Sequence, residues 1–402
     1  MLAQFYPPII GGEELHVRNL SIELAARGHD VVVATLGRKE FPRFEIDRGV
    51  HIHRIGGTMQ RMSVLFSENE RQYAPPFPDP EVLWALRRII LQERPDIIHA
   101  HNWMVHSFIP LKAWSKAKLV VTLHSYNLVC ATERLMYRGA VCSGPTLFKC
   151  LRCASEHFGV TKGLPTTVAN LLSGMVERGV VDMFLPISQA VAEGTQLAKY
   201  GVPYRVVPNF VANNVDELCD NAHPLLSQLP QEDFLLFVGD VVRDKGVEVL
   251  FQAYAEMEQH LPLVLIGRAA TDLSTSYPWN TRVLQSWPHE AVMSAWSRCS
   301  IALVPSIWPD PCPTVAIEAM TMGKPVIASC TGGLSDIVID GETGFLVPPG
   351  DPRALREAIQ LLLENPERRK HMGNMAMQRA IEFQARTLVP CIEQIYRETV
   401  QS

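Results

Sequence analysis

Residues 301–328 read Ile301-Ala-Leu-Val-Pro305, then, after two residues, Trp308-Pro-Asp310-Pro-Cys-Pro-Thr314-Val-Ala-Ile-Glu318-Ala-Met, then Gly323-Lys-Pro-Val-Ile-Ala328. Short apolar runs separated by turn residues and helical sequence are typical of parallel strands joined by helices. The stretch therefore predicts a strand that ends at Pro305, a loop, a helix that begins near Thr314, and a second strand over 325–328.

The start of the predicted helix is suited to an anion. Pro313 fits the first helical turn because its missing N–H would have no partner there. The amides of Thr314, Val315 and Ala316 are then expected to be free to bind a negative group. Since one acid precedes the helix and another follows one turn inside it, the pattern indicates a nucleotide diphosphate site with a carboxylate on each side.

The two acids are Asp310 and Glu318, with seven residues between them, and Gly332-Gly333 follows. This pattern resembles the second-domain signature of the family 4 glycosyltransferases, which use sugar nucleotides and have the GT-B fold. The family usually has glutamate where this chain has Asp310, whose shorter carboxylate must come closer to reach the same atom. The alternative is an ordinary strand–loop–helix in which the acids only cap and solubilise.

Length and composition agree with an α/β enzyme of two domains. A chain of 402 residues exceeds the usual size of one core. The formal charge of −5 argues against nucleic acid as a partner. No apolar run reaches the ~18 residues of a spanning helix, and the N-terminus lacks a secretory pattern. We expect a cytoplasmic protein, at most peripheral at the inner face of a membrane. The first strand is short because the sequence begins at Met1, which favours a truncated start.

The alternation of strands and helices predicts two doubly wound, Rossmann-like parallel-sheet domains that face each other across a cleft. The expected parts are an N-terminal domain over 1–208 with a cysteine-rich inserted loop at 125–166, a linker over 209–232, a C-terminal domain over 233–383, and a terminal helix over 384–402. By family resemblance this last helix crosses back to the first domain.

Two features of the first domain are expected at the ends of its strands. Gly11-Gly12 closes the first strand-to-helix turn and resembles the family's Pro-Pro-x-x-Gly-Gly loop. His124 ends the strand Leu119–His124 and resembles the family's Thr-x-His position. Its neutral ring could bond a sugar hydroxyl, or it could merely tie the strand end to a neighbouring loop. His99 and His101 are weaker candidates for the same cleft.

In the second domain, cations follow the first strand in Gly239-Asp-Val-Val-Arg-Asp-Lys-Gly246. Lys245 matches the family's lysine, whereas Asp240 occupies the place of its usual arginine. Arg243 is expected to reach in instead. Cations here would clamp the diphosphate and stabilise the charge that grows on it as the sugar departs. Gly267-Arg268 is expected either to lie beside the base of the nucleotide or to form part of a plain surface loop.

The resemblance assigns roles to these residues. It implies catalysis by His124, Asp310 and Lys245. It implies donor binding by Gly11, Gly12, Arg243, Lys245, Thr314, Val315 and Glu318, with Glu318 on the ribose hydroxyls. A nucleotide diphosphate sugar is then the donor, and the acceptor is a glycan, a lipid-linked glycan or a small molecule. The resemblance also implies that the anomeric configuration is retained and that catalysis requires no cofactor. Rival functions are a sugar-nucleotide 2-epimerase and a non-catalytic sugar-nucleotide-binding protein.

Four of the nine cysteines, Cys130, Cys142, Cys150 and Cys153, are spaced C-x11-C-x7-C-x2-C. A C-x2-C pair is typical of zinc ligands, so one hypothesis is a structural zinc that staples the inserted loop. Free thiols, a disulfide or a redox role are the alternatives. The amphipathic stretch Leu83–Leu91, with Trp114 and nearby lysines, could contact an anionic bilayer or simply cover the sheet.

Overall fold

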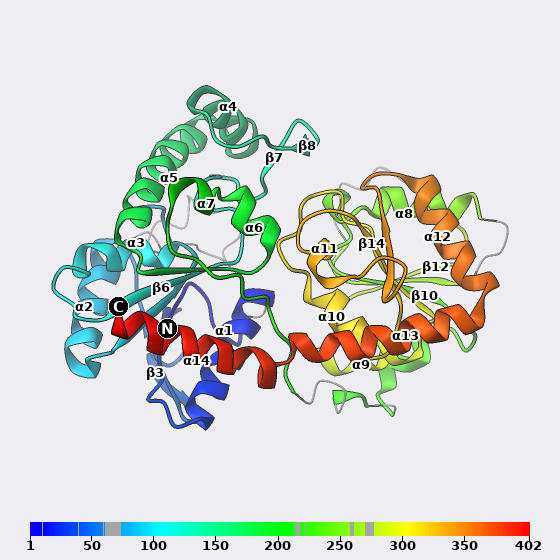
Figure 1. Cartoon of the computed structure of the whole chain (residues 1–402), viewed down its shortest axis with the longest axis horizontal. Helices are drawn as coiled ribbons and strands as arrows, with labels where there is room; N and C mark the ends of the chain where they lie inside the picture. Colours follow the sequence, from blue (N-terminus) through cyan, green and yellow to red (C-terminus); the bar gives the residue numbers. More distant parts are fainter. Residues whose placement is uncertain are drawn as a thin grey trace. The chain divides into compact units, whose positions relative to one another are not determined.

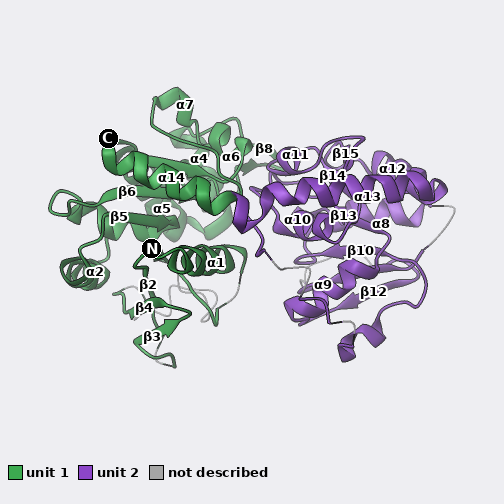
Figure 2. Ribbon diagram, turned by 60° about the horizontal axis from the view of Figure 1, so that its bottom comes forward, with its two compact units in different colours: residues 1–208, 388–402 green, residues 209–387 purple. Residues whose placement is uncertain are grey.

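The computed structural model describes residues 1–9, 11–38, 40–58, 60, 74–213, 218–220, 222–257, 261–269 and 277–402. The chain forms two compact units, which Figure 2 colours separately. Unit 1 comprises Met1–Pro208 and Leu388–Ser402, and unit 2 comprises Asn209–Thr387.

Unit 1 is built on a seven-stranded sheet with the order β3-β4-β2-β1-β5-β6-β9. The strands are β1 Leu2–Ala3, β2 Val32–Leu36, β3 Phe44–Asp47, β4 Val50–Ile55, β5 Ile97–His101, β6 Lys118–Leu123 and β9 Met183–Pro186. All neighbours are parallel except β3, which pairs antiparallel with β4. The predicted parallel strands are therefore confirmed to within two residues, and β3 is an addition.

The helices of unit 1 include α1 Gly12–Ala26, α2 Pro80–Glu93, α3 Val105–Phe108, α6 Gln189–Gly194 and α7 Leu197–Tyr200, and two 3-10 helices, Asn102–Met104 and Ile109–Leu111. The start of α2 is fixed by Asp79, whose side chain accepts from two first-turn amides, and by Pro80 at the first helical position. Val82 and Leu86 are buried beneath it, whereas Trp84 faces outward.

The prediction of an inserted loop over 125–166 was wrong. The segment contains a short hairpin, β7 Met136–Tyr137 and β8 Ala140–Val141, and then α4 Leu147–Phe158; α5 Val160–Val180 begins inside it. Gly159, at φ 80°, joins the two helices. Basic, cysteine and glycine residues suggested a loop, but α4 carries a strongly one-sided apolar pattern, and Figure 1 shows it beside α5.

Unit 2 has a six-stranded parallel sheet with the order β12-β11-β10-β13-β14-β15. Its strands are β10 Leu235–Val238, β11 Leu263–Ile266, β12 Thr281–Leu284, β13 Ile301–Val304, β14 Val326–Ser329 and β15 Gly344–Val347. Most of these strands consist of buried apolar residues, as expected for a sheet covered on both faces. The strands predicted near 234, 263, 301, 325 and 345 are confirmed.

The helices of unit 2 are α8 Val247–Ala255, α9 His289–Arg298, α10 Thr314–Thr321, α11 Leu334–Ile337, α12 Pro352–Glu364 and α13 Pro366–Ala380, with 3-10 helices at Pro224–Gln228, Arg243–Lys245 and Ile381–Phe383. Part of the expected linker over 209–232 lies outside the described residues. The last helix, α14 Ala385–Gln401, begins in unit 2, and its residues from Leu388 belong to unit 1.

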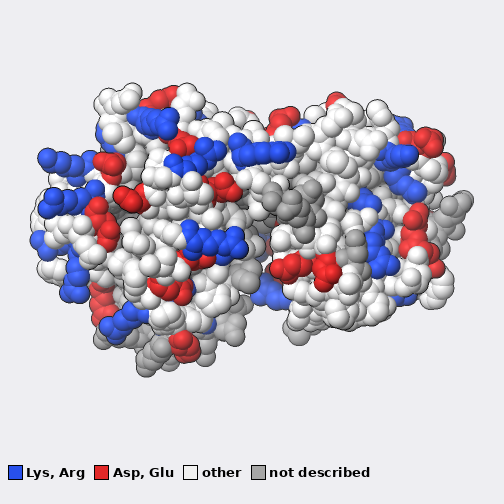
Figure 3. Space-filling model, turned by 90° about the horizontal axis from the view of Figure 1, so that it is seen from below, with Lys and Arg blue, Asp and Glu red and all other residues white. Residues whose placement is uncertain are grey.

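Within the described ranges, no helix combines the length and apolar character needed to cross a bilayer. On the face drawn in Figure 3, Lys and Arg side chains are interleaved with Asp and Glu rather than gathered in one basic patch.

Candidate active site

The candidate site of unit 2 lies where its strand order reverses. From β10 the sheet continues in one direction through β11 and β12 and in the other through β13, β14 and β15. Ligands of open α/β sheets bind beyond the carboxyl ends of the strands at such a switch point. The loops that follow β10 and β13 carry Lys245 and Asp310. The topology therefore brings the two predicted loops to one edge of the sheet.

Lys245 and Asp310 form an ion pair between these loops. Asp310 is buried, with its side chain 8% exposed, and Lys245 is 29% exposed. The Lys245 ammonium also lies 5.5 Å from the centre of the Trp308 ring, over its face. A buried carboxylate is costly unless it is paired, so Lys245 and Asp310 hold each other in place.

The trailing glycine pair supports Asp310 from behind. The Gly333 amide donates to the Asp310 carbonyl at 2.8 Å. Gly332 has φ +58°, and a Cβ there would lie 2.2 Å from the Asp310 carbonyl oxygen. Only glycine combines this conformation with this approach. Gly332-Gly333 thus sets the position of the Asp310 loop.

The start of α10 offers fewer amides than the sequence predicted. The amides of Thr314 and Val315 precede the first intrahelical bond, but Ala316 donates to the Pro313 carbonyl at 3.1 Å. The prediction that the Ala316 amide is free to bind an anion was therefore wrong, because a tight i→i+3 turn at the helix start uses its N–H. Thr314 and Val315 remain the candidates for binding an anion at this helix start.

Glu318 lies inside α10 and is largely buried. Its Oε1 is 3.1 Å from Nε2 of His289, the first residue of α9. The hydrogen bond to Glu318 raises the pKa of His289, against the opposing effect of burial. Sequence reasoning missed His289, because no local pattern shows that α9 packs against α10.

Arg243 and Asp240 are paired with other residues. Arg243 is 78% exposed and lies 3.3 Å from Glu248. Asp240 accepts two bonds from Arg268, at 3.0 and 2.8 Å. Arg268 thus places a guanidinium beside the position where the family resemblance expects arginine. The sequence left its role open between the base and a surface loop, and only the register of β10 beside β11 shows this pairing.

In unit 1 the strand order reverses between β1 and β5, and the glycine loop follows β1. Gly12 begins α1, and a Cβ there would meet no atom of the described residues within 4 Å. The described residues therefore leave room for a side chain at this turn.

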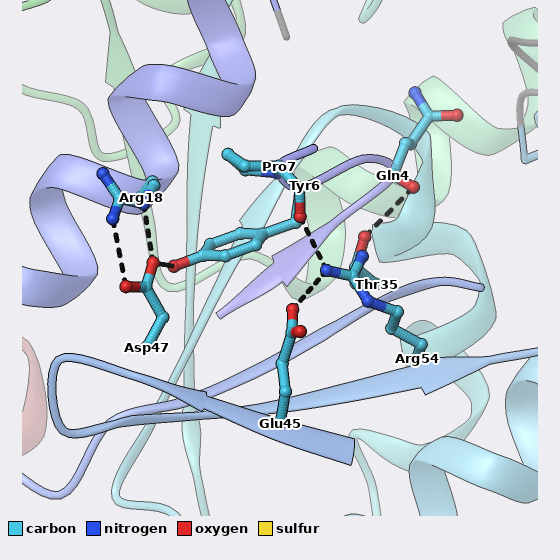
Figure 4. Close-up of polar contacts among 8 residues, drawn as sticks. All are labelled: Gln4, Tyr6, Pro7, Arg18, Thr35, Glu45, Asp47 and Arg54. Carbon is cyan, nitrogen blue, oxygen red and sulfur yellow. Dashed lines mark hydrogen bonds and ion pairs between the residues drawn. The ribbon is translucent and has the colours of Figure 1, made fainter. Parts of the chain in front are cut away.

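Figure 4 shows how the chain before the glycine loop is held. Arg18 of α1 donates to both carboxylate oxygens of Asp47, at 2.6 and 3.0 Å, and Tyr6 donates to the same carboxylate at 3.3 Å. Arg54 donates to the Pro7 carbonyl at 2.6 Å. The antiparallel strand β3, which contributes Asp47, was not predicted, so these anchors were missed.

His124 follows β6, is partly exposed, and lies against the buried histidines His16 and His101. Its Nε2 lies 2.8 Å from Nδ1 of His101, and the two rings are stacked. Both ring nitrogens of His99 are hydrogen-bonded to other residues, since they lie 2.6 Å from the hydroxyls of Thr122 and Tyr396. The structure therefore makes His101 the partner of His124 and gives His99 an anchoring role.

The cluster also defines the tautomer of His124. Within the described part of the chain, Nε2 of His101 is buried and has no hydrogen-bond partner. A buried N–H without an acceptor is costlier than a buried lone pair, so the His101 proton belongs on Nδ1 and is donated to His124. Burial lowers the pKa of both rings well below the ordinary value. His124 is therefore neutral near pH 7 and carries its proton on Nδ1.

The structural zinc hypothesis is not supported. Among the described residues, which include all four cysteines, no group of three or more His, Cys, Asp or Glu could hold a metal ion. Cys130, Cys142, Cys150 and Cys153 are free thiols. The sulfurs of Cys142 and Cys153 instead approach the carbonyls of Gly144 and Met136, each at 3.6 Å.

Comparisons with known proteins agree with this architecture. The Glycosyltransferase Family 4 profile matches residues 10–214, more than half of the chain, and the profile described as glycosyl transferases group 1 matches residues 226–379. Glycogen synthase of Mycobacterium tuberculosis (strain H37Rv) is 26% identical, with 98% of this chain and 93% of that protein covered.

Two solved structures share the fold. Sucrose-phosphate synthase from Thermosynechococcus elongatus has a TM-score of 0.74 at 23% identity, covering 99% of this chain and 97% of that one. Anabaena HepE, solved in complex with UDP and glucose, has a TM-score of 0.68 at 18% identity, covering 99% and 98%. The two parallel α/β sheets, of seven and six strands, are those of GT-B glycosyltransferases. The chain belongs to glycosyltransferase family 4 and is a retaining, nucleotide-sugar-dependent enzyme of that family.

Proposed function

We propose that the enzyme transfers a sugar from a nucleoside diphosphate donor to a hydroxyl of a glycan or lipid-linked glycan, in the cytoplasm at the inner face of a membrane. The observation that carries the proposal is the ion pair of Lys245 with buried Asp310 at the switch point of unit 2. A cation at that edge, next to the start of a helix, is suited to a diphosphate.

Unpaired polar atoms support a ligand site in the same loop. Ser306 Oγ and Trp308 Nε1 are buried without a hydrogen-bond partner in the portion of the chain that the structure describes. Buried polar groups normally have partners, so such atoms are expected where a ligand completes the site. Glu318, oriented by His289, is the proposed acceptor for the ribose hydroxyls, because a carboxylate can accept from both members of a diol.

The proposed reaction needs no protein nucleophile and no metal. The bond between the anomeric carbon and the diphosphate oxygen breaks, and the acceptor oxygen bonds to that carbon on the same face. The electron pair leaves with the diphosphate, and the departing phosphate takes the acceptor's proton. Lys245 and the amides of Thr314 and Val315 stabilise the charge that develops on the leaving group. Asp310 positions the sugar, and Nδ1–H of His124 donates to one of its oxygens. Gly11, Gly12 and Arg243 are further donor contacts under this proposal.

The test combines nucleotide binding with turnover. We would measure the melting temperature with a panel of nucleoside diphosphates and their sugars, and then release of the diphosphate in the presence of candidate glycan acceptors. Wild type should be stabilised by one nucleotide class, with or without EDTA. Glu318→Ala should lose that shift, whereas Lys245→Met should reduce kcat by about 100-fold or more.

The matched control is Arg353→Met, which removes an exposed arginine of α12 whose side chain pairs with Glu357 at 2.8 Å. It should behave as wild type. If no nucleotide stabilises the folded protein, or if Lys245→Met and Arg353→Met have equal activity, the assignment of the donor site is wrong.

A further inference from the structure

Helix α5 has the reverse of the usual amphipathic arrangement. Its buried residues are small or polar: Gly163, Thr167, Asn170, Gly174 and Glu177. Its exposed residues include the large apolar side chains of Val160, Leu164, Val168, Leu172, Met175 and Val176. A helix on the surface of a water-soluble domain normally buries its apolar stripe and exposes its polar one.

The inverted face is continuous. Val160, Leu164, Val168 and Leu172 recur at every fourth residue, and at ~100° per residue each step turns the position by only about 40°. The four side chains therefore form one stripe along the helix, which Met175 and Val176 extend. Leu172 is 56% exposed and Met175 is 58% exposed, so solvent contacts this stripe over its length.

The buried face of α5 packs against other elements of unit 1. A Cβ on Gly163 would lie 2.5 Å from the Ala154 carbonyl oxygen, and one on Gly174 would lie 2.5 Å from that of Leu128. The glycines thus let α5 approach the backbone of α4 and of the loop after β6. Rotation of α5 to bury its apolar stripe would bring large side chains against these carbonyls. The apolar stripe is therefore fixed outward by packing.

Further exposed apolar side chains lie on α4 and on the hairpin. Phe148, in the first turn of α4, is 85% exposed, and Leu147 and Val141 are also exposed. Figure 1 shows α4, α5 and the β7–β8 hairpin at one border of unit 1. Many large apolar side chains exposed on neighbouring elements indicate a site of interaction with a protein or a membrane.

The charges around this surface select between those partners. Over residues 147–180 the chain has four cationic side chains, Lys149, Arg152, Lys162 and Arg178, and two carboxylates, Glu156 and Glu177. Glu177 is buried, which raises its pKa to about 8, so it is mostly neutral at pH 7. The segment is therefore locally positive in a chain whose formal charge is −5.

From this geometry we infer that α4 and α5 form a docking surface for an anionic lipid bilayer. The apolar stripe enters the boundary between headgroups and acyl chains, and the basic residues meet acidic headgroups. The surface does not depend on the assignment of the donor site, but it would bring unit 1 to a lipid-linked acceptor. It differs from the α2 surface around Trp84 and Trp114, which the sequence suggested for the same role.

The test measures binding of the full chain to vesicles without any nucleotide. Wild type should cosediment with vesicles that contain phosphatidylglycerol and bind pure phosphatidylcholine vesicles at least tenfold more weakly. Phe148→Ser, Leu172→Ser and Met175→Ser combined should lose binding by tenfold or more. These side chains are exposed, so the fold should be retained.

The matched control replaces Trp84, Leu91 and Trp114 by serine, three exposed apolar residues of the α2 surface. It should bind as wild type does. The inference is overturned if folded wild type ignores anionic vesicles, or if the control variant loses binding as strongly. It is also overturned if wild type is a dimer that the α4–α5 variant converts to monomers, which would make a second copy the occupant.

Discussion

At the scale of single residues, Glu177 links the packing of α5 to pH. Its Oε1 lies 3.5 Å from His106 Nε2, and both side chains are buried. Burial raises the pKa of Glu177 from 4.5 to about 8 and lowers that of His106 to about 4. Near pH 7 both groups are therefore neutral, and the contact is not an ion pair.

The sign of the pH effect follows from proton binding. Between pH 6.5 and 8 the unfolded chain has already released the Glu177 proton, while the folded chain retains it. Raising the pH therefore removes stability that this carboxyl contributes. Between pH 6.5 and 8, we expect the free energy of unfolding of Glu177→Gln to rise by ~1–2 kcal/mol relative to that of wild type. Urea unfolding at several pH values measures the difference.

The control for this prediction is Glu156→Gln, the same chemical change at an exposed site of α4. Its difference from wild type should stay constant with pH. Parallel curves for wild type and Glu177→Gln would contradict the raised pKa, since the amide does not titrate. Because wild type and variant share the other groups with lowered pKa values, such as Met1 and His16, the contributions of those groups to the pH dependence cancel in the comparison.

Sequence patterns indicated as candidates those single residues that lie in short motifs. Lys245, Asp310 and Glu318 stand next to glycines, prolines and strand ends whose spacing is informative. His289 and His101 were not identified as partners of Glu318 and His124, because those contacts join residues 29 and 23 positions apart. Such pairs depend on packing between elements, and hydrophobic periodicity carries no information about it.

At the scale of elements, the strands of unit 2 were predicted correctly, whereas the segment 125–166 was predicted wrongly as a loop. The difference is again between local sequence patterns and features that depend on packing. Buried parallel strands read as apolar runs, so β10, β11, β13, β14 and β15 could be predicted. In α5 the apolar side chains face solvent and Pro165 lies inside the helix, so its pattern does not indicate a covering helix. The segment 125–166, which contains only the first turns of α5, was assigned to a loop because it is rich in cysteine, glycine and basic residues.

The strand–loop–helix around Asp310 gives a prediction at this scale. Gly332→Ala adds a Cβ 2.2 Å from the Asp310 carbonyl oxygen, at φ +58°. The left-handed conformation costs an alanine ~1–2 kcal/mol, and the clash must also displace the Asp310 loop. We expect a lower melting temperature and a loss of kcat/KM of tenfold or more in the transferase assay.

Gly341→Ala is the matched control, because Gly341 also has positive φ, at +76°, but within the described part of the chain a Cβ there meets no atom within 4 Å. Its stability should fall by the cost of the left-handed conformation, whereas its activity should be retained. Equal activity of the two variants would show that Gly332 does not position Asp310.

At the scale of the whole molecule, α14 is the element that both units share. It begins in unit 2 and is held in unit 1 by Glu393, whose carboxylate is 3.1 Å from Arg27 Nη1 and 2.7 Å from His29 Nε2. Tyr396, one turn further along, reaches His99. The amphipathic pattern predicted this helix, but its partners lie more than 290 positions away in the sequence.

These contacts predict that the two units can be destabilised separately. Glu393→Ala leaves the partly buried Arg27 without this carboxylate, so the unfolding transition of unit 1 should move down by several degrees, at ~2–4 °C per kcal/mol. Calorimetry with and without the stabilising nucleotide would follow both units. Because the proposed donor residues Lys245, Asp310 and Glu318 belong to unit 2, the nucleotide-induced shift should persist in the variant. Glu357→Ala, at an exposed pair on α12, should change neither transition. A single transition that falls as a whole, together with loss of the nucleotide shift, would instead mean that α14 makes the two units one cooperative body.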